Sequence, residues 1–152
     1  MYLLIFSERL KDLMELEGIS NRALSARIVT DRKNIREWLQ GKHFPRCDAL
    51  LKLAVCFQVS TDYLVGLDDN VNCIQSEREH YEMRETQQRF FLLFTQFMRD
   101  KKITQYAVAR DLQIGQKCVS NWLKKDSMPE TPTLIKLSQM MNCTLDFLLG
   151  RV

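Results

Sequence analysis

Residues 20–42 read SNRALSARIVTDRKNIREWLQGK. Ser20 is a typical N-cap of a helix, and Leu24 and Ile28 follow it at helical spacing. After a break of a few residues a second helical pattern begins, whose apolar stripe consists of Ile35, Trp38 and Leu39. Two short helices joined by so short a connection predict a helix-turn-helix.

The same pattern occurs again at residues 104–126, which read TQYAVARDLQIGQKCVSNWLKKD. An offset of 84 residues aligns 6–66 with 90–150 without a gap, and 14 of these 61 pairs of residues are identical. This period is too long for the unit of a solenoid. The sequence therefore predicts two tandem copies of one small domain, at residues 1–67 and 89–152, with a linker at 68–88.

Each copy is predicted to contain five short helices and no strand, so the expected fold class is all-α. The first helix of each copy carries an apolar stripe, formed by Phe6, Leu10, Leu13 and Met14 and by Phe90, Phe94, Phe97 and Met98. The predicted N-caps are Ser20, Asp31, Ser60, Thr104, Gly115, Thr131 and Thr144, with Pro132 as the first helical residue after Thr131. Helices are predicted to end at Gly41, Gly66 and Gly150.

The linker contains the letters SERE at residues 76–79, a pattern typical of a helix capping box. We therefore expect a helix to run from about residue 77 into the first helix of the second copy. Three roles for the linker stay open: a solvated connection, a packing surface for a neighbouring domain, or a dimer contact.

Several classes of protein are excluded or disfavoured by composition. The 152 residues contain no apolar run of the roughly 20 residues that a membrane helix needs, and no signal peptide. The five Cys are widely spaced and odd in number, which indicates reduced thiols in a cytoplasmic protein. With only two His, no Gly-rich loop and no paired carboxylates, we expect no catalytic site, no metal and no cofactor.

Charge is distributed unevenly along the chain, although the net charge is only +3. Residues 1–70 contain ten Lys and Arg and ten Asp and Glu, whereas residues 87–152 contain ten and five. The second copy is therefore basic, and the first keeps its positive charge in local clusters.

The third helix of each copy is the one that carries Trp38 or Trp122. Once its apolar stripe is buried, its other side must be a polar face. That face comprises Arg32, Lys33, Arg36 and Glu37 in one copy and Gln116, Lys117, Ser120 and Asn121 in the other. Such side chains suit base edges in the major groove of double-stranded DNA, because Arg and Lys bind guanine and Asn and Gln bind adenine. Asn34 lies at the edge of the face, and Asn21, Gln40, Lys42, His43, Gln105, Lys124 and Lys125 are candidates for phosphate contacts.

The two stretches 19–66 and 103–150 together resemble the Cro/cI-type (lambda-repressor-like, XRE-type) helix-turn-helix proteins. With the first helices, the resemblance covers about four-fifths of the chain. It implies a bacterial or phage transcriptional regulator that binds an operator, with DNA contacts from Asn21 or Gln105 and from the start of each third helix. We expect repression rather than activation.

The sequence departs from that family at two places. In the turn, Val29 and Gln113 replace a frequent Gly, and after the third helix of the second copy Lys125 stands where the first copy has Gly41. Two arrangements therefore stay open: both copies read DNA within one chain, or one copy reads while the other mediates a homodimer or docks a partner. The rival function is a protein-interaction module, antitoxin-like or adaptor, that reads no DNA sequence. No small-molecule effector is evident.

Overall fold

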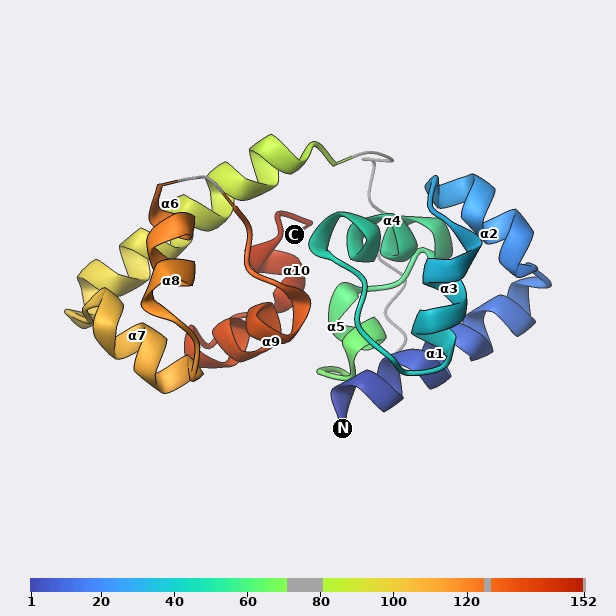
Figure 1. Ribbon diagram of the computed structural model, residues 1–152, viewed down its shortest axis with the longest axis horizontal. Coiled ribbons are helices and arrows are strands. Elements are labelled where there is room, and N and C mark those ends of the chain that lie inside the picture. Colours follow the sequence, from blue (N-terminus) through green and yellow to red (C-terminus); the bar gives the residue numbers. More distant parts are fainter. Residues whose placement is uncertain (71–80, 125–126, 152) are drawn as a thin grey trace. The chain divides into compact units, whose positions relative to one another are not determined.

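The computed structural model describes residues 1–70, 81–124 and 127–151 (Figure 1). Within these residues it contains ten helices and no strand, which confirms the all-α class. The chain divides into two compact units, Met1–Tyr81 and Glu82–Val152, called unit 1 and unit 2 below. The exact boundaries of the predicted domains and linker stay predictions.

Unit 1 contains five helices around one core (Figure 1). Helix α1 packs against α3 and α5, while α2 packs against α3 and α4. The side chains at the centre are fully buried, among them Phe6, Leu10, Leu24 and Leu50. The helices are α1 (Tyr2–Glu17), α2 (Asn21–Ile28), α3 (Arg32–Leu39), α4 (Cys47–Phe57) and α5 (Thr61–Val65).

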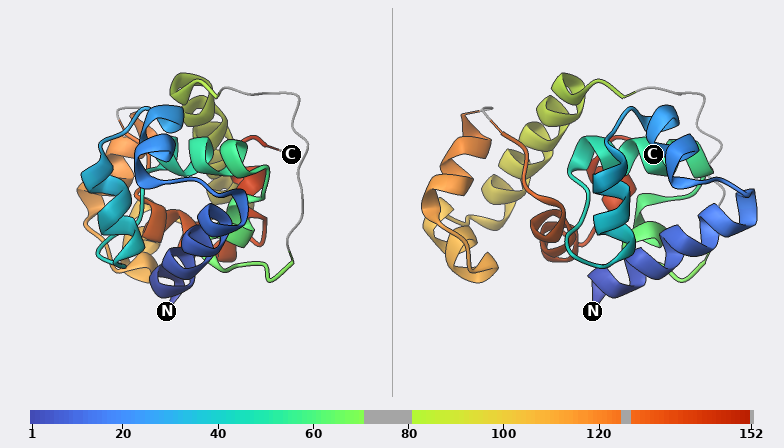
Figure 2. Two further views of the ribbon diagram at one scale, coloured as in Figure 1. Left: turned by 90° about the vertical axis from the view of Figure 1, so that its right-hand side faces the viewer. Right: turned by 45° about the vertical axis from the view of Figure 1, so that its right-hand side comes forward.

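Unit 2 repeats this order of helices, and Figure 2 shows that within each unit the helices cross one another rather than lie parallel. Helix α8 packs against α6 and α7, and α10 packs against α6 and α9. The helices are α6 (Met83–Lys101), α7 (Gln105–Leu112), α8 (Gln116–Leu123), α9 (Thr131–Met140) and α10 (Leu145–Leu148).

Most of the predicted apolar stripes are buried as expected. Phe6, Leu10, Leu13 and Met14 all lie in the core of unit 1. In unit 2 the stripe is correct for Phe90 and Phe94, but Phe97 and Met98 are only half-buried. Leu39 and Leu123 are also half-buried, because each ends its helix at the rim of the core.

Four of the predicted N-caps are confirmed by side-chain hydrogen bonds. The hydroxyls of Ser20 and Thr104 accept from the backbone N–H three residues later, and those of Ser60 and Thr144 do the same. Asp31 occupies its predicted N-cap position, but its side chain makes no capping hydrogen bond. The prediction for Thr131 was wrong by one residue, since α9 already begins there and Glu130 precedes it.

The prediction of one continuous helix from about residue 77 into the first helix of the second copy was also wrong. Helix α6 begins at Met83, and Tyr81 and Glu82 are not helical. The backbone of Glu82 accepts the first bonds of the helix, including one from the Thr86 hydroxyl. The proposed capping box at 76–79 and Lys125 lie outside the described residues.

The two units share left-handed backbone positions even where their residues differ. Values of φ are +65° at Gly18 and +54° at Lys102, and +91° at Gly66 and +85° at Gly150. The equivalent turn residues Val29 and Gln113 have φ of 54° and 57°. Gly41, as predicted, is left-handed after α3. The backbone of unit 2 therefore has the same conformation as that of unit 1 at these positions, including those where the residue types differ.

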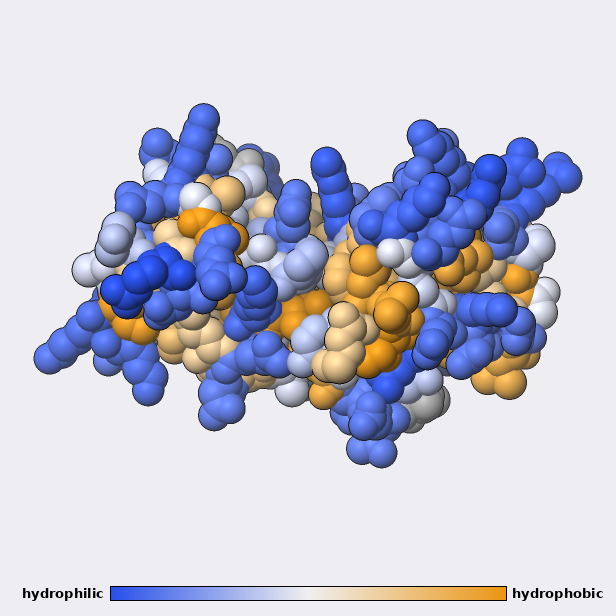
Figure 3. Space-filling model, turned by 60° about the horizontal axis from the view of Figure 1, so that its bottom comes forward, coloured by the Kyte–Doolittle hydropathy of each residue, from blue (hydrophilic) through white to orange (hydrophobic). Residues whose placement is uncertain are grey.

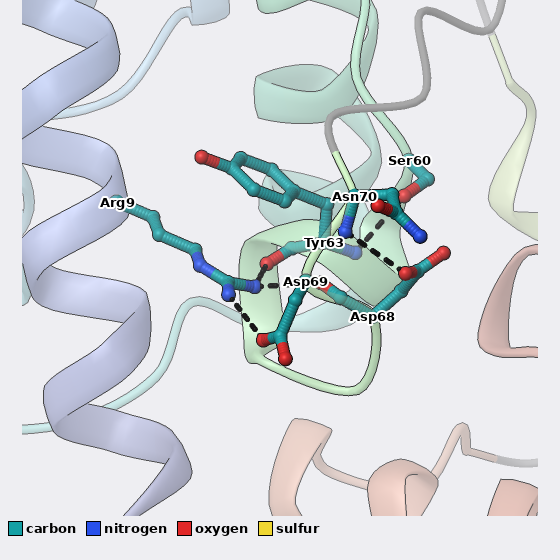
Figure 4. A network of polar contacts seen from close by, with 6 residues as sticks. All are labelled: Arg9, Ser60, Tyr63, Asp68, Asp69 and Asn70. Carbon is teal, nitrogen blue, oxygen red and sulfur yellow. Dashed lines mark hydrogen bonds and ion pairs between the residues drawn. The ribbon is translucent and has the colours of Figure 1, made fainter.

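An arginine from the first helix clamps the last helix in both units. Arg9 donates to the carbonyl oxygens of Tyr63 and Asp68 and to the Asp69 carboxylate, and its guanidinium lies 4.3 Å from the Tyr63 ring centroid (Figure 4). In unit 2, Arg89 donates to the Phe147 carbonyl and lies 4.8 Å from that ring centroid. Residues 63 and 147 are equivalent in the repeat, but the arginines are one helical turn apart.

We expect Val29→Gly to stabilise unit 1. Val29 is 81% exposed and ends α2 with φ 54°, a conformation that costs a non-glycine residue about 1–2 kcal/mol and suits a β-branched residue poorly. Gly avoids that cost but loses about 0.5–1 kcal/mol more chain entropy on folding. The net gain should be about 1 kcal/mol, or about 5 °C in melting temperature.

The measurement is thermal unfolding followed by Trp38 fluorescence in a Trp122→Phe background. Ala26→Gly is the matched control, because Ala26 is exposed inside α2 and glycine there should cost about 1 kcal/mol. Equal destabilisation by both substitutions would show that the turn is not strained.

Candidate nucleic-acid interface

Helix α3 is fixed to unit 1 by its buried side. Ile35 is fully buried and Trp38 is only 3% exposed, as the sequence predicted. The Ser7 hydroxyl on α1 donates to the Trp38 carbonyl oxygen at 2.6 Å, a short bond within the protein interior. These contacts set the rotation of α3 about its own axis, and this rotation decides which side chains face solvent.

Helix α8 is held in unit 2 by different partners. Trp122 is 4% exposed and meets the rings of Phe90 and Phe94 nearly edge-on, at centroid distances of 6.0 Å and 5.8 Å. Val119 is fully buried beside it. Edge-to-face packing of this kind is favourable and directional, so it also fixes the rotation of the helix.

The predicted reading residues of unit 1 fall into two groups. Arg32, Lys33 and Arg36 are exposed on α3, whereas Ile35 and Trp38 are buried. Asn34 is half-buried instead, and its amide donates to the Thr30 hydroxyl in the turn at 3.0 Å. Gln40 and Lys42 are exposed at the end of α3, and Asn21 is half-buried at the start of α2.

In unit 2 the corresponding side chains are neutral except for the lysines. Gln116 and Lys117 are exposed in the first turn of α8, while Ser120 and Asn121 one turn later are half-buried. Gln105 is exposed at the first position of α7, and Lys124 is exposed after α8. In the view of Figure 3, the side chains that stand out along the outline of the molecule are mostly hydrophilic, and hydrophobic side chains show between them.

An ion pair on the α3 face was not anticipated from the sequence. His43 Nε2 lies 2.7 Å from Glu37 Oε2, and His43 Nδ1 lies 3.1 Å from the Phe44 carbonyl oxygen. The sequence places Glu37 on the polar face of the third helix and makes His43 a candidate for a phosphate contact, but it does not predict a contact between the two. His43 follows Glu37 by six residues and lies beyond the end of α3 at Leu39, so helix periodicity does not predict a contact between them.

The pair predicts a raised pKa for the His43 ring. The hydrogen bond that His43 donates to the Glu37 carboxylate, followed by the one that it donates to the Phe44 carbonyl oxygen, raises the pKa of His43. The same bond from His43 lowers the pKa of the Glu37 carboxyl. Because the His43 pKa is raised in the folded state, its stabilising contribution is complete below the ordinary value of about 6.5 and is lost as pH rises through the raised pKa.

We expect an NMR titration of the His43 ring to give a pKa above that of an unstructured histidine, and Glu37→Gln to bring it back toward that value. Both side chains are partly exposed, at 48% for His43 and 23% for Glu37, so the effect on unfolding free energy should be small. Lys33→Ala serves as the control, because it leaves the hydrogen bond intact. An unchanged His43 pKa in Glu37→Gln would contradict the pairing.

Other kinds of site find no support in the described part of the chain. No group of three or more His, Cys, Asp or Glu is placed there to hold a metal ion. Cys47, Cys56 and Cys118 are free thiols, and burial raises the pKa of the Cys47 thiol to about 12. Across residues 1–70, 81–124 and 127–151, no helix combines the length and apolar character that crossing a membrane requires.

Comparison with known proteins points to the same elements. Residues 96–148, which run from α6 through α10, match the family described as helix-turn-helix. The chain is similar to the HTH-type transcriptional regulator ImmR of Bacillus subtilis (strain 168), at 25% identity over 123 residues. That alignment covers 78% of this chain and 97% of the relative. No solved structure gives a significant match.

Proposed function

Because unit 2 carries a helix-turn-helix domain of the kind found in DNA-binding transcriptional regulators, we propose that this protein reads double-stranded DNA in the major groove and represses transcription. The observation that carries the proposal is the exposed face of the third helix. In both units this helix is anchored by a buried Trp, and its exposed side chains are Arg and Lys in unit 1 and Gln and Lys at its start in unit 2. Helices with such faces fit the major groove and bond base edges.

We further propose that unit 1 is a second copy of the same domain and that both copies read DNA. The support is the repeated order of helices, the repeated N-caps and the left-handed positions described above. Residues 70–82, between the last contacts of unit 1 and the start of α6, could span at most about 45 Å when extended, and half-sites one helical turn apart are separated by about 34 Å. One chain could then occupy two half-sites, and the second contact would be intramolecular.

Selection from a random-sequence duplex pool at near-physiological salt tests this proposal. Two enriched half-sites of different sequence at a fixed spacing would support reading by both units of one chain. A palindrome would support one reading unit within a homodimer. No enriched motif would favour the rival function, a protein-interaction module that retains the fold.

Single substitutions then assign each half-site to a unit. We expect Arg32→Ala and Lys117→Ala each to weaken binding of the selected duplex by roughly tenfold or more, because each would lose a contact to guanine. Binding should be measured by fluorescence anisotropy on duplexes in which one half-site is scrambled. If Lys117→Ala has no effect on either half-site, unit 2 does not read DNA.

A further inference from the structure

One carboxylate lies among the cations of the α3 face. Glu37 follows Lys33 by four residues, one turn further along the outward side of α3, and Lys42 lies just beyond the end of the helix. Lys33 and Lys42 both act on its charge and help to lower its pKa. A carboxylate on a surface that meets phosphates would normally weaken binding through like-charge repulsion. Its presence on this face therefore calls for a specific role.

The geometry of His43 shows how that repulsion is reduced. Both ring nitrogens face groups that only accept hydrogen bonds, the Glu37 carboxylate at 2.7 Å and the Phe44 carbonyl at 3.1 Å. A neutral imidazole has one N–H and could satisfy only one of them, whereas the protonated ring donates to both. The protonated form therefore fits this site, and its positive charge balances that of Glu37, although the nearby Lys42 opposes it.

The hydrogen bond uses Oε2 of Glu37, and within the described residues Oε1 makes no further hydrogen bond. In the major groove the only hydrogen-bond donors are the amino groups of cytosine and adenine. Adenine presents the acceptor N7 beside its amino group, which would repel a carboxylate. Cytosine presents a C–H there instead, so it is the base that a fixed carboxylate should prefer.

We propose that Glu37, held in position by His43, is the residue through which unit 1 selects a cytosine. This inference rests on the proposed function, in which the face of α3 enters the major groove. Glu37 would accept a hydrogen bond from the cytosine amino group, and His43 would act as a positioning residue. Unit 2 has Asn121 and Ser127 at the equivalent positions. The Asn121 amide suits adenine, so the two half-sites should differ at this base pair.

The test compares base preferences of the wild-type chain and Glu37→Gln, each selected from the same random duplex pool. Wild-type protein should prefer cytosine at one position of the unit 1 half-site by roughly tenfold to a hundredfold. Glu37→Gln should lose this preference and gain one for adenine, because a glutamine amide pairs with adenine. Glu17→Gln is the matched control: Glu17 is exposed at the end of α1, so the charge change is the same but the preference should remain.

His43 variants test the positioning role. His43→Ala should reduce the cytosine preference severalfold at the same position only, while His43→Gln should restore it, since its amide can donate to Glu37 without a charge. In the wild type the preference should weaken as pH rises through the raised pKa of His43, and in His43→Gln it should not vary with pH.

The outcomes separate the inference from the proposed function. If wild-type protein enriches a motif and Glu37→Gln enriches the same motif with the same preferences, the inference fails and the proposed function stands. If wild-type protein enriches no motif, both fail.

Discussion

Trp122→Ala is expected to abolish the cooperative folding of unit 2. Trp122 is buried between α8 and α6, in edge-to-face contact with Phe90 and Phe94. Truncating a buried Trp to Ala costs about 3–5 kcal/mol, and each aromatic pair adds about 0.5–1.5 kcal/mol beyond its buried area. A unit of this size has a total stability of only about 4–10 kcal/mol at about 0.05–0.15 kcal/mol per residue. The loss is comparable to the whole stability of unit 2, so the unit should show no cooperative unfolding transition of its own.

The chain offers a built-in reporter for this experiment, because it has two Trp and each unit contains one. In Trp122→Ala the remaining indole is Trp38, which reports on unit 1 alone. We expect far-UV circular dichroism to show the loss of unit 2 helices while the Trp38 emission stays native.

Trp122→Phe is the control, since it retains an aromatic ring at the same place and should cost much less. If the free energies of unfolding of unit 2 in Trp122→Ala and in Trp122→Phe differ by less than about 1 kcal/mol, the aromatic cluster does not dominate the core of unit 2. If Trp38 loses its native emission together with the helices of unit 2, the two units do not fold independently.

Specific DNA affinity is expected to fall about a hundredfold between 50 and 200 mM salt. Each Lys or Arg that neutralises a phosphate releases a counterion, and four such contacts give a slope of about −3.6 in a plot of log affinity against log salt. With Arg32 and Lys117 assigned to guanine, the other exposed cations around the two third helices supply that number: Lys33, Arg36 and Lys42 in unit 1, and Lys124 in unit 2. A protein-interaction module would show little DNA affinity even at the lower salt.

Anisotropy titrations of the selected duplex at four salt concentrations measure the slope. Lys42→Ala should reduce its magnitude by about one while leaving base preferences unchanged. Lys52→Ala removes the same charge from unit 1, but Lys52 is exposed on α4 and should leave the slope as it was. A slope near zero for the wild-type chain would rule out binding through phosphates.

Local pattern was enough to predict most of the fold. Hydrophobic spacing placed Ile35, Trp38, Val119 and Trp122 in the core, and all four are buried. The hydroxyl N-caps were found because a cap bonds to a backbone group only three residues away. With the buried side of α3 known, the exposure of Arg32, Lys33 and Arg36 followed from helix geometry.

Two sets of side-chain contacts could not be predicted from local sequence patterns. The equivalent rings Tyr63 and Phe147 are covered by arginines from different turns of the first helix, Arg9 and Arg89. Asp146 forms a buried ion pair with Arg151, which lies beyond the end of α10. Because long side chains reach several positions on a neighbouring helix, packing rather than periodicity selects the partner.

The sequence by itself determined the class of the fold, the duplicated helical pattern and the solvent-facing side of each third helix, because these depend on the period of a helix and on contacts within a few residues. Tertiary structure alone decided that His43 returns to Glu37 across the end of α3, since that contact depends on the path of the loop after Gly41. The proposed base selectivity of unit 1 follows from that contact.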